Sequence, residues 1–183
     1  KVRLFGNSGL SFFFFFASGY WNLMDPTNGY TAINKHALEE LDLDNIAKRY
    51  FFESDMLINL NIENAVVVDV EIPAKYGDEE SSLSITKTLV GFPPKLFKGL
   101  CKRIFLKYFI YDFNMLSLYL VVGLPMLFFG IVFGSIKWIE AIVSNIETST
   151  GTIMLAVLPI ILGTQFILQA IQIDMNNIPR KEK

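Results

Sequence analysis

The sequence has very few of the residues on which cysteine and histidine chemistry depends. Cys101 is the only cysteine among 183 residues, so a disulfide-stabilised fold is excluded. His36 is the only histidine, and it falls in a segment expected to be an exposed helix. The sequence also has no metal-ligand spacing, no Ser/His/Asp set and no glycine-rich phosphate loop. No activity and no metal ligand can therefore be assigned from these motifs.

A net positive charge is missing as well. The chain carries 16 basic and 18 acidic side chains, which gives a formal charge of −2 at pH 7. Proteins that bind nucleic acid need a positive field to attract its phosphates, so nucleic acid is not an expected partner. What the chain has in excess is apolar surface, because 52% of its residues are hydrophobic and 17 are phenylalanine. Such a composition excludes a disordered protein.

The charges that are present fall into separate zones. Residues 39–80 carry twelve acidic and three basic side chains, whereas residues 81–111 carry six basic side chains and no acidic one. From residue 113 the chain is apolar apart from one short polar break. We therefore expect four parts: an α/β part over residues 1–85, a basic collar over 86–112, a membrane part over 113–176 and a basic tail over 177–183.

Two uncharged runs cover residues 113–136 and 148–173. Each is longer than the ~20 residues that a helix needs to cross a ~30 Å hydrocarbon core. Backbone groups in lipid must be paired within their own segment, so we predict transmembrane helices at about 113–136 and 150–173. The alternative, a pair of buried core helices in a soluble protein, is disfavoured by their length.

The break between the two runs is predicted to be a short interfacial loop, with Trp138 at the level of the lipid headgroups. Lys137 is the only basic residue in this loop, whereas the collar and the tail are both rich in bases. The positive-inside rule therefore predicts a cell (inner) membrane protein with its soluble part and both termini in the cytoplasm.

The collar is predicted to be an amphipathic helix lying on an anionic leaflet. Its bases Lys95, Lys98 and Lys102 follow i, i+3, i+7 spacing, and Arg103 adds a fourth positive charge. The opposite side is expected to be apolar: Leu96, Phe97, Leu100, Cys101, Ile104 and Tyr108. A plain solvated linker helix is the alternative.

The front of the chain has the pattern of an incomplete α/β domain. Helices are expected over residues 10–22, 34–41 and 53–63, with Asn34 as the cap of the second. The run AVVVDVEI at residues 65–72, ended by Pro73, is predicted to be a strand, and residues 30–33 a second one. A doubly wound sheet needs more strands than these, so we expect a piece of a longer protein.

Three polar segments in this part are candidates for chemistry. Asp25 opens a turn that Pro26 and Gly29 bend, and it is equally well explained as a structural turn residue. Glu53 and Asp55 lie where a helix begins, where a carboxylate either stabilises the helix or positions a ligand. The loop over residues 76–82 is either a binding loop or a solvated linker.

These segments together resemble the C-terminal half of the catalytic domain of family 2 glycosyltransferases, of the polyprenyl-phosphate and dolichyl-phosphate sugar transferase type. SGYWNLMDPTNGYTAI at 18–33 is similar to the family's active-site turn, and YFFESDMLINL at 50–60 to the helix that supplies an acid. VVDVEIPAKYGDEESSLSI at 67–85 is similar to its strand and mobile loop, although an arginine usual in that loop is absent. The two spans complete the resemblance.

The resemblance implies a GT-A, Rossmann-like fold and the transfer of a sugar from a nucleotide sugar to a lipid phosphate. It implies Asp25, Asp55 and Glu53 as catalytic groups, and the following substrate contacts: Thr27, Asn28, Gly29, Tyr30, Gly77, Ser81 and Ser82. Lys95, Lys98, Lys102 and Arg103 are expected at the lipid phosphate and membrane surface. A divalent metal, Mg or Mn, is implied too, with its Asp-x-Asp ligands in a region upstream of this chain.

A second hypothesis belongs to another class of protein. The chain would then be a non-catalytic two-span membrane anchor, whose front part serves as a docking subunit of a larger complex. In either case membrane lipids are expected partners, and a homo-oligomer is compatible with an anchor of this kind.

Overall fold

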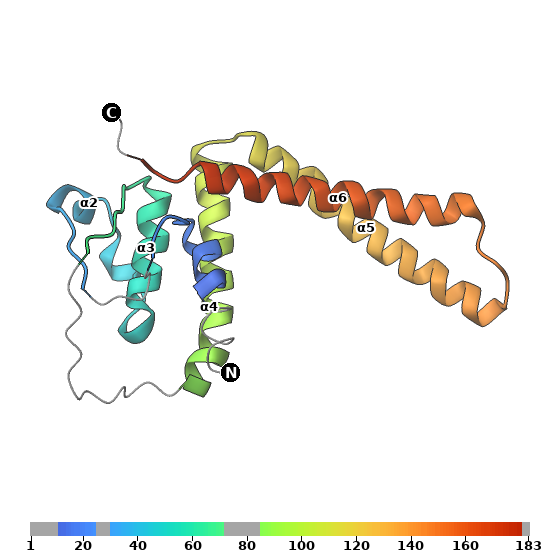
Figure 1. Cartoon of the computed structure of the whole chain (residues 1–183), viewed down its shortest axis with the longest axis horizontal. Coiled ribbons are helices and arrows are strands. Elements are labelled where there is room, and N and C mark those ends of the chain that lie inside the picture. Colours follow the sequence, from blue (N-terminus) through green and yellow to red (C-terminus); the bar gives the residue numbers. More distant parts are fainter. Residues whose placement is uncertain (1–10, 25–29, 72–84, 181–183) are drawn as a thin grey trace. The chain divides into compact units, whose positions relative to one another are not determined.

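The computed structural model describes residues 11–24, 30–71 and 85–180 of the chain. The chain divides into two compact units. The first, which we call the head unit, comprises Lys1–Tyr111 together with Asn177–Lys183, and the second, the hairpin unit, comprises Asp112–Asn176. The chain therefore leaves the head unit once, passes through the hairpin unit and returns (Figure 1).

Helices build the described part of the head unit. The elements in chain order are a helix over residues 11–18, α2 (Lys35–Glu39), η1 (Leu43–Asn45), η2 (Arg49–Phe51), α3 (Phe52–Ile62), α4 (Ile85–Phe105) and the π-helical η3 (Leu106–Tyr111). The predicted helices at 34–41 and 53–63 are confirmed as α2 and α3, and the Asn34 side chain caps α2 by accepting from the Ala37 backbone N–H at 2.7 Å.

The predicted α/β fold is wrong for the described residues, which contain no strand. Residues 65–71 are extended but join no backbone ladder, and residues 30–33 also lack regular structure. Asn64 adopts a left-handed φ of 55° and ends α3, after which the chain turns into the extended segment. The expectation of a Rossmann-like sheet therefore fails in this part of the molecule.

Hydrogen bonds that involve side chains, instead of backbone pairs, join residues 65–71 to residues 20–24. The Tyr20 hydroxyl donates to the Ala65 carbonyl at 2.6 Å, and the Met24 backbone N–H donates to the Asp69 carboxylate at 2.6 Å. Between these two bonds, the Asn22 side-chain amide donates to the Val67 carbonyl. All three bonds join residues 45 positions apart in the sequence. The two segments thus run parallel in register, but a strand requires backbone-to-backbone pairs, which this arrangement does not form.

The helix over residues 11–18 is held against α4 by a buried arginine. Arg103 is 0% exposed, and its guanidinium donates to the carbonyls of Ala17 at 3.0 Å and Phe16 at 3.2 Å. Carbonyls in the last turn of a helix lack intrahelical partners and attract cations. Gly19 ends this helix with a φ of 75°, and a Cβ there would lie 2.6 Å from the Arg103 guanidinium, so only glycine fits.

α3 and α4 lie side by side and enclose much of the head core (Figure 1). The Ile58 side chain packs against the α4 backbone at Gly99, where a Cβ would lie 2.5 Å from the Ile58 Cδ1 atom. Ile58 is 0% exposed and Leu96 is 1% exposed, so solvent is excluded from the contact between α3 and α4. The Phe run at residues 12–16 contributes Phe14 to the same core, while Phe12 stays exposed.

The hairpin unit consists of α5 (Met115–Ser144) and α6 (Thr150–Asn176), two antiparallel helices that lie side by side (Figure 1). Both are long and apolar enough to cross a membrane. Only 22% and 11% of their most apolar windows are buried, whereas the core helices of a soluble protein are mostly buried. The prediction of two helices that are long and apolar enough to span a membrane is therefore confirmed.

Small residues let the two helices touch backbone to backbone. Ala156, Gly163 and Ala170 recur every seven residues along α6, and all three are buried. A Cβ on Gly163 would lie 2.6 Å from the Leu127 backbone nitrogen, and one on Gly130 would lie 2.8 Å from the Ala156 carbonyl oxygen. In membranes such close approach supplies the packing that holds helices together.

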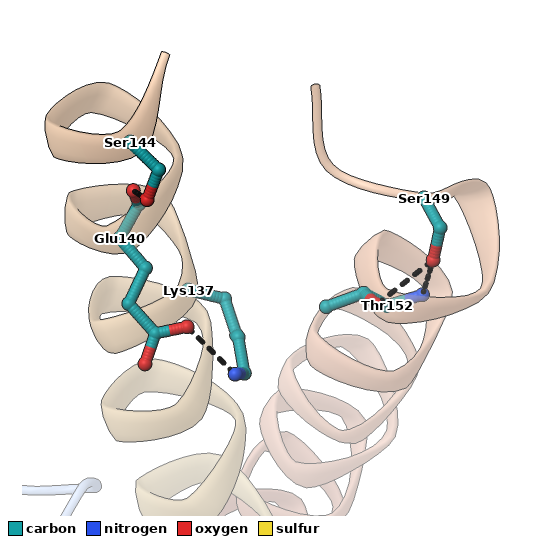
Figure 2. A network of polar contacts seen from close by, with 5 residues as sticks. All are labelled: Lys137, Glu140, Ser144, Ser149 and Thr152. Carbon is teal, nitrogen blue, oxygen red and sulfur yellow. Dashed lines mark hydrogen bonds and ion pairs between the residues drawn. The ribbon is translucent and has the colours of Figure 1, made fainter. Parts of the chain in front are cut away.

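The break between the spans is shorter than predicted. α5 continues through Lys137 and Trp138 to Ser144, and it ends at Asn145, which adopts a left-handed φ of 53°. Figure 2 shows that the polar side chains at this end bond within their own helices. Lys137 pairs with Glu140 at 2.7 Å, which lets the helix continue because the two charges offset each other.

Tyr20→Phe is expected to remove a pH-dependent part of the stability. Burial raises the pKa of the Tyr20 phenol well above its ordinary value of 10.0, so the folded state retains the proton that the unfolded chain loses. The lost hydrogen bond should lower the free energy of unfolding by about 1 kcal/mol at neutral pH. This difference should shrink as the pH rises above about 10. Denaturant titrations of both proteins from pH 7 to 11 measure it, and a difference constant with pH would contradict the assignment.

Gly163→Leu is expected to separate α5 from α6. A leucine side chain does not fit, since even its Cβ would lie 2.6 Å from the Leu127 backbone nitrogen, and overpacking of this kind costs about 1–3 kcal/mol or more. Unfolding in mixed detergent micelles should occur at a lower fraction of SDS. Leu162→Phe, at a neighbouring position that is 44% exposed, is the matched control and should leave the transition unchanged.

Candidate functional site

A cavity of about 700 Å³ opens in the head unit between α3, α4 and the segment over residues 40–47. This volume lies within the ~300–1,000 Å³ that small-molecule sites usually have. Charged and amide side chains around it are Glu40, Asp42, Asn45, Asp55, Asn59, Glu63, Lys95, Lys98 and Lys102. The cavity, which we call the lysine pocket, therefore brings together residues that the sequence had placed in separate segments.

Three lysines enter the lysine pocket from one side of α4. The Lys102 ammonium donates to the Asn59 amide oxygen at 2.7 Å, and Lys95 lies over the Phe51 ring at 5.6 Å from its centroid. Lys98 has no hydrogen-bond or ion-pair partner among the residues that the structure describes. Spacings of three and four residues place these side chains on one face of a helix, so their charges add.

Four acids also line the lysine pocket, and three of them have partners other than the lysines. The Asp55 carboxylate accepts from the Ala47 backbone N–H at 2.7 Å, and Asp42 accepts from the Asn45 amide at 2.6 Å. Glu40 lies 3.2 Å from His36, one helical turn away. In the described ranges no ion pair joins any of these acids to the three lysines.

The three lysines are therefore not ion-paired to a described acid, although four carboxylates line the same cavity. A neutral amide and an aromatic ring orient two of them without cancelling their charge, and the third faces the cavity without a partner among the described residues. Ammonium groups held in this way attract a compact anion such as a phosphate, to which several hydrogen bonds can be donated at once. The side of the pocket formed by α4 is therefore the part that can contact an anionic group.

The structure separates the other predicted site residues. Glu53 lies in the first turn of α3, outside the lining of the lysine pocket. Tyr30 is 85% exposed in a segment without regular structure. Arg103 lies in the core and bonds to chain carbonyls, rather than on the surface with Lys102. The remaining predicted contacts lie outside the described residues: Asp25, Thr27, Asn28, Gly29, Gly77, Ser81 and Ser82.

A divalent metal does not fit the described part of the chain. Among residues 11–24, 30–71 and 85–180, no three acidic, histidine or cysteine side chains converge closely enough to hold an ion. The acids around the lysine pocket are spread along α3 and the segment before it, and three of them are already bonded within the chain.

Sequence reasoning missed Asn59, whose amide oxygen fixes Lys102. A signal for it exists in the spacing of Asp55 and Asn59, two polar residues that lie one turn apart on α3 and both line the pocket. Asn59 also donates to the Asp55 backbone carbonyl at 2.7 Å, so its amide has a fixed orientation. A polar stripe opposite a lysine stripe marks two helices that share a polar pocket.

Comparison with protein-family models, with curated proteins and with solved structures gives no match to this chain.

Arg103→Gln and Lys98→Gln should have opposite consequences although both remove a positive charge from α4. Arg103→Gln leaves buried carbonyls without a donor, and each costs about 1–3 kcal/mol. Lys98→Gln removes an exposed side chain that no described residue pairs with, and should stay within about 0.5 kcal/mol of wild type. Thermal unfolding of the two variants measures both effects. Equal destabilisation would show that the guanidinium does not hold the head unit together.

Proposed function

We propose that the protein is a membrane-bound glycosyltransferase component that presents a lipid phosphate in the lysine pocket. The sugar would come from a nucleotide sugar, and the acceptor would be a polyprenyl- or dolichyl-phosphate. The observation that carries this proposal is the row of three lysine ammonium groups around one cavity, none of which is ion-paired to a described acid. The resemblance of the sequence to family 2 glycosyltransferases supplies the reaction.

The path of the chain supports a lipid acceptor. Both helices of the hairpin connect to the head unit, because α5 follows it directly and the chain returns to it after α6. If the hairpin spans the membrane, both connections lie on one side, and the bases of α4 and of the C-terminal tail indicate the cytoplasmic side. A phosphate carried by a membrane lipid is then available where the head unit is tethered.

The chemistry that follows needs little from a base. A phosphate oxygen of the acceptor is already anionic, so it can attack the anomeric carbon of the sugar while the nucleoside diphosphate leaves. The contribution of the pocket would be to position that oxygen and to offset the charge of the phosphate. Asp55 fits a positioning role, since its carboxylate fixes the Ala47 backbone at the wall of the pocket.

The second candidate is a membrane anchor that docks a separate catalytic subunit. The observation that favours it is the helical character of the described head unit, which offers no sheet on which a nucleotide sugar would be expected to lie. In this case the lysine pocket would have no preference for a lipid phosphate over an uncharged lipid.

Binding of a short-chain polyprenyl phosphate by the full chain in nanodiscs tests the proposal. Lys98→Gln should weaken binding about tenfold, since hydrogen bonds to charged groups contribute about 1.5–3 kcal/mol. The corresponding polyprenol, which lacks the phosphate, should bind weakly and equally to both proteins. Lys35→Gln, on the exposed face of α2, is the control for loss of a charge elsewhere. Equal binding of phosphate and alcohol by wild type would contradict the lipid-phosphate site and favour the anchor.

A further inference from the structure

An aromatic stripe on α4 faces away from the head core. Phe97 and Phe105 are 59% and 57% exposed, and Cys101, midway between them, is exposed as well. Their spacing of four residues places all three side chains on one face of the helix. Phe109 extends the stripe, since its ring stacks on that of Phe105 with centroids 6.1 Å apart. Such an exposed aromatic row is unusual on a soluble surface.

This stripe keeps Phe97 and Cys101 of the apolar side that the sequence predicted, but not its other members. Leu96, Leu100 and Tyr108, expected to face a membrane, are between 1% and 7% exposed and face the interior. Cys101, which the sequence placed on the same apolar side, is exposed. Because other residues of α4 already fill the core, Phe97 and Phe105 are not needed there, and their exposure requires a separate explanation.

The aromatic stripe borders the lysines of α4. Lys98 and Lys102 each follow a stripe residue by one position, which is about 100° around the helix. Both lysines are exposed, so the solvent-facing half of α4 carries one aromatic row and one basic row side by side. Helices that lie in a membrane interface have this arrangement, with rings among the acyl chains and ammonium groups among anionic headgroups.

We propose that the Phe97–Cys101–Phe105 stripe of α4 inserts into the headgroup region of an anionic lipid leaflet. The charge of the bordering lysines identifies the partner, because a lipid surface supplies both the apolar layer and the negative charge that the two rows require. The sequence of elements agrees, since α4 passes through η3 directly into the apolar helix α5. The rings of the stripe lie outside the lining of the lysine pocket, so their insertion does not require an acceptor in that pocket.

The single cysteine allows a direct test, because Cys101 lies at the centre of the stripe. A nitroxide attached to Cys101 of the full chain in vesicles reports its collisions with oxygen, which concentrates in lipid, and with a water-soluble nickel complex. Vesicles of phosphatidylcholine with added phosphatidylglycerol should give a severalfold higher ratio of oxygen to nickel collisions than a label in water. Asp44→Cys in a Cys101→Ser background is the aqueous control, at an exposed position in η1.

Two further comparisons define the outcome. Phe97→Gln with Phe105→Gln should lower the ratio at Cys101, and so should vesicles of phosphatidylcholine alone. A label at Cys101 that meets the nickel complex as often as the Asp44→Cys label does would overturn the proposal. A label shielded from both reagents would overturn it as well, because that result identifies a protein surface over the stripe. The vesicles contain no polyprenyl phosphate, so the result does not depend on the function of the pocket.

Discussion

The buried guanidinium of Arg103 is the contact on which the head unit depends. It joins α4 to the last turn of the helix over residues 11–18, two elements more than eighty positions apart in the sequence. Burying a charge costs free energy unless hydrogen bonds replace water, and here the orphan carbonyls of a helix end supply them. Gly19 must lack a side chain for this contact to form, so the left-handed turn and the arginine require each other.

With α4 held in place by Arg103, three of its faces contact three different surroundings. Leu96, Leu100 and Arg103 face the core, whereas Lys95, Lys98 and Lys102 face the lysine pocket. A third arc carries the exposed aromatic stripe. A helix 21 residues long has room for three such faces because its residues are distributed around the axis every 100°. Core packing therefore fixes the rotation of α4 and, with it, the direction of the other two faces.

Structure that depends on a long uniform pattern was predictable from the sequence. Which of two adjacent similar residues is buried was not. The two uncharged runs predicted α5 and α6 because twenty apolar residues have few alternatives. The Asn34 cap was predictable because it is local. Arg103 could not be separated from Lys102, since both are basic and adjacent, and only the position of the helix over 11–18 decides which one is buried. The valines at 65–72 predicted a strand, but a strand exists only with a paired neighbour.

The extended segment over residues 65–71 has a consequence for the self-association of the protein. One of its edges is covered by side chains of residues 20–24, while Val66, Val68 and Val70 are 46%, 69% and 76% exposed. β-Branched residues on an extended backbone without ladder partners form a template for strand addition. Concentrated preparations of the head unit should therefore self-associate through this segment, and a lysine in place of Val68 is the substitution that would keep the protein dispersed.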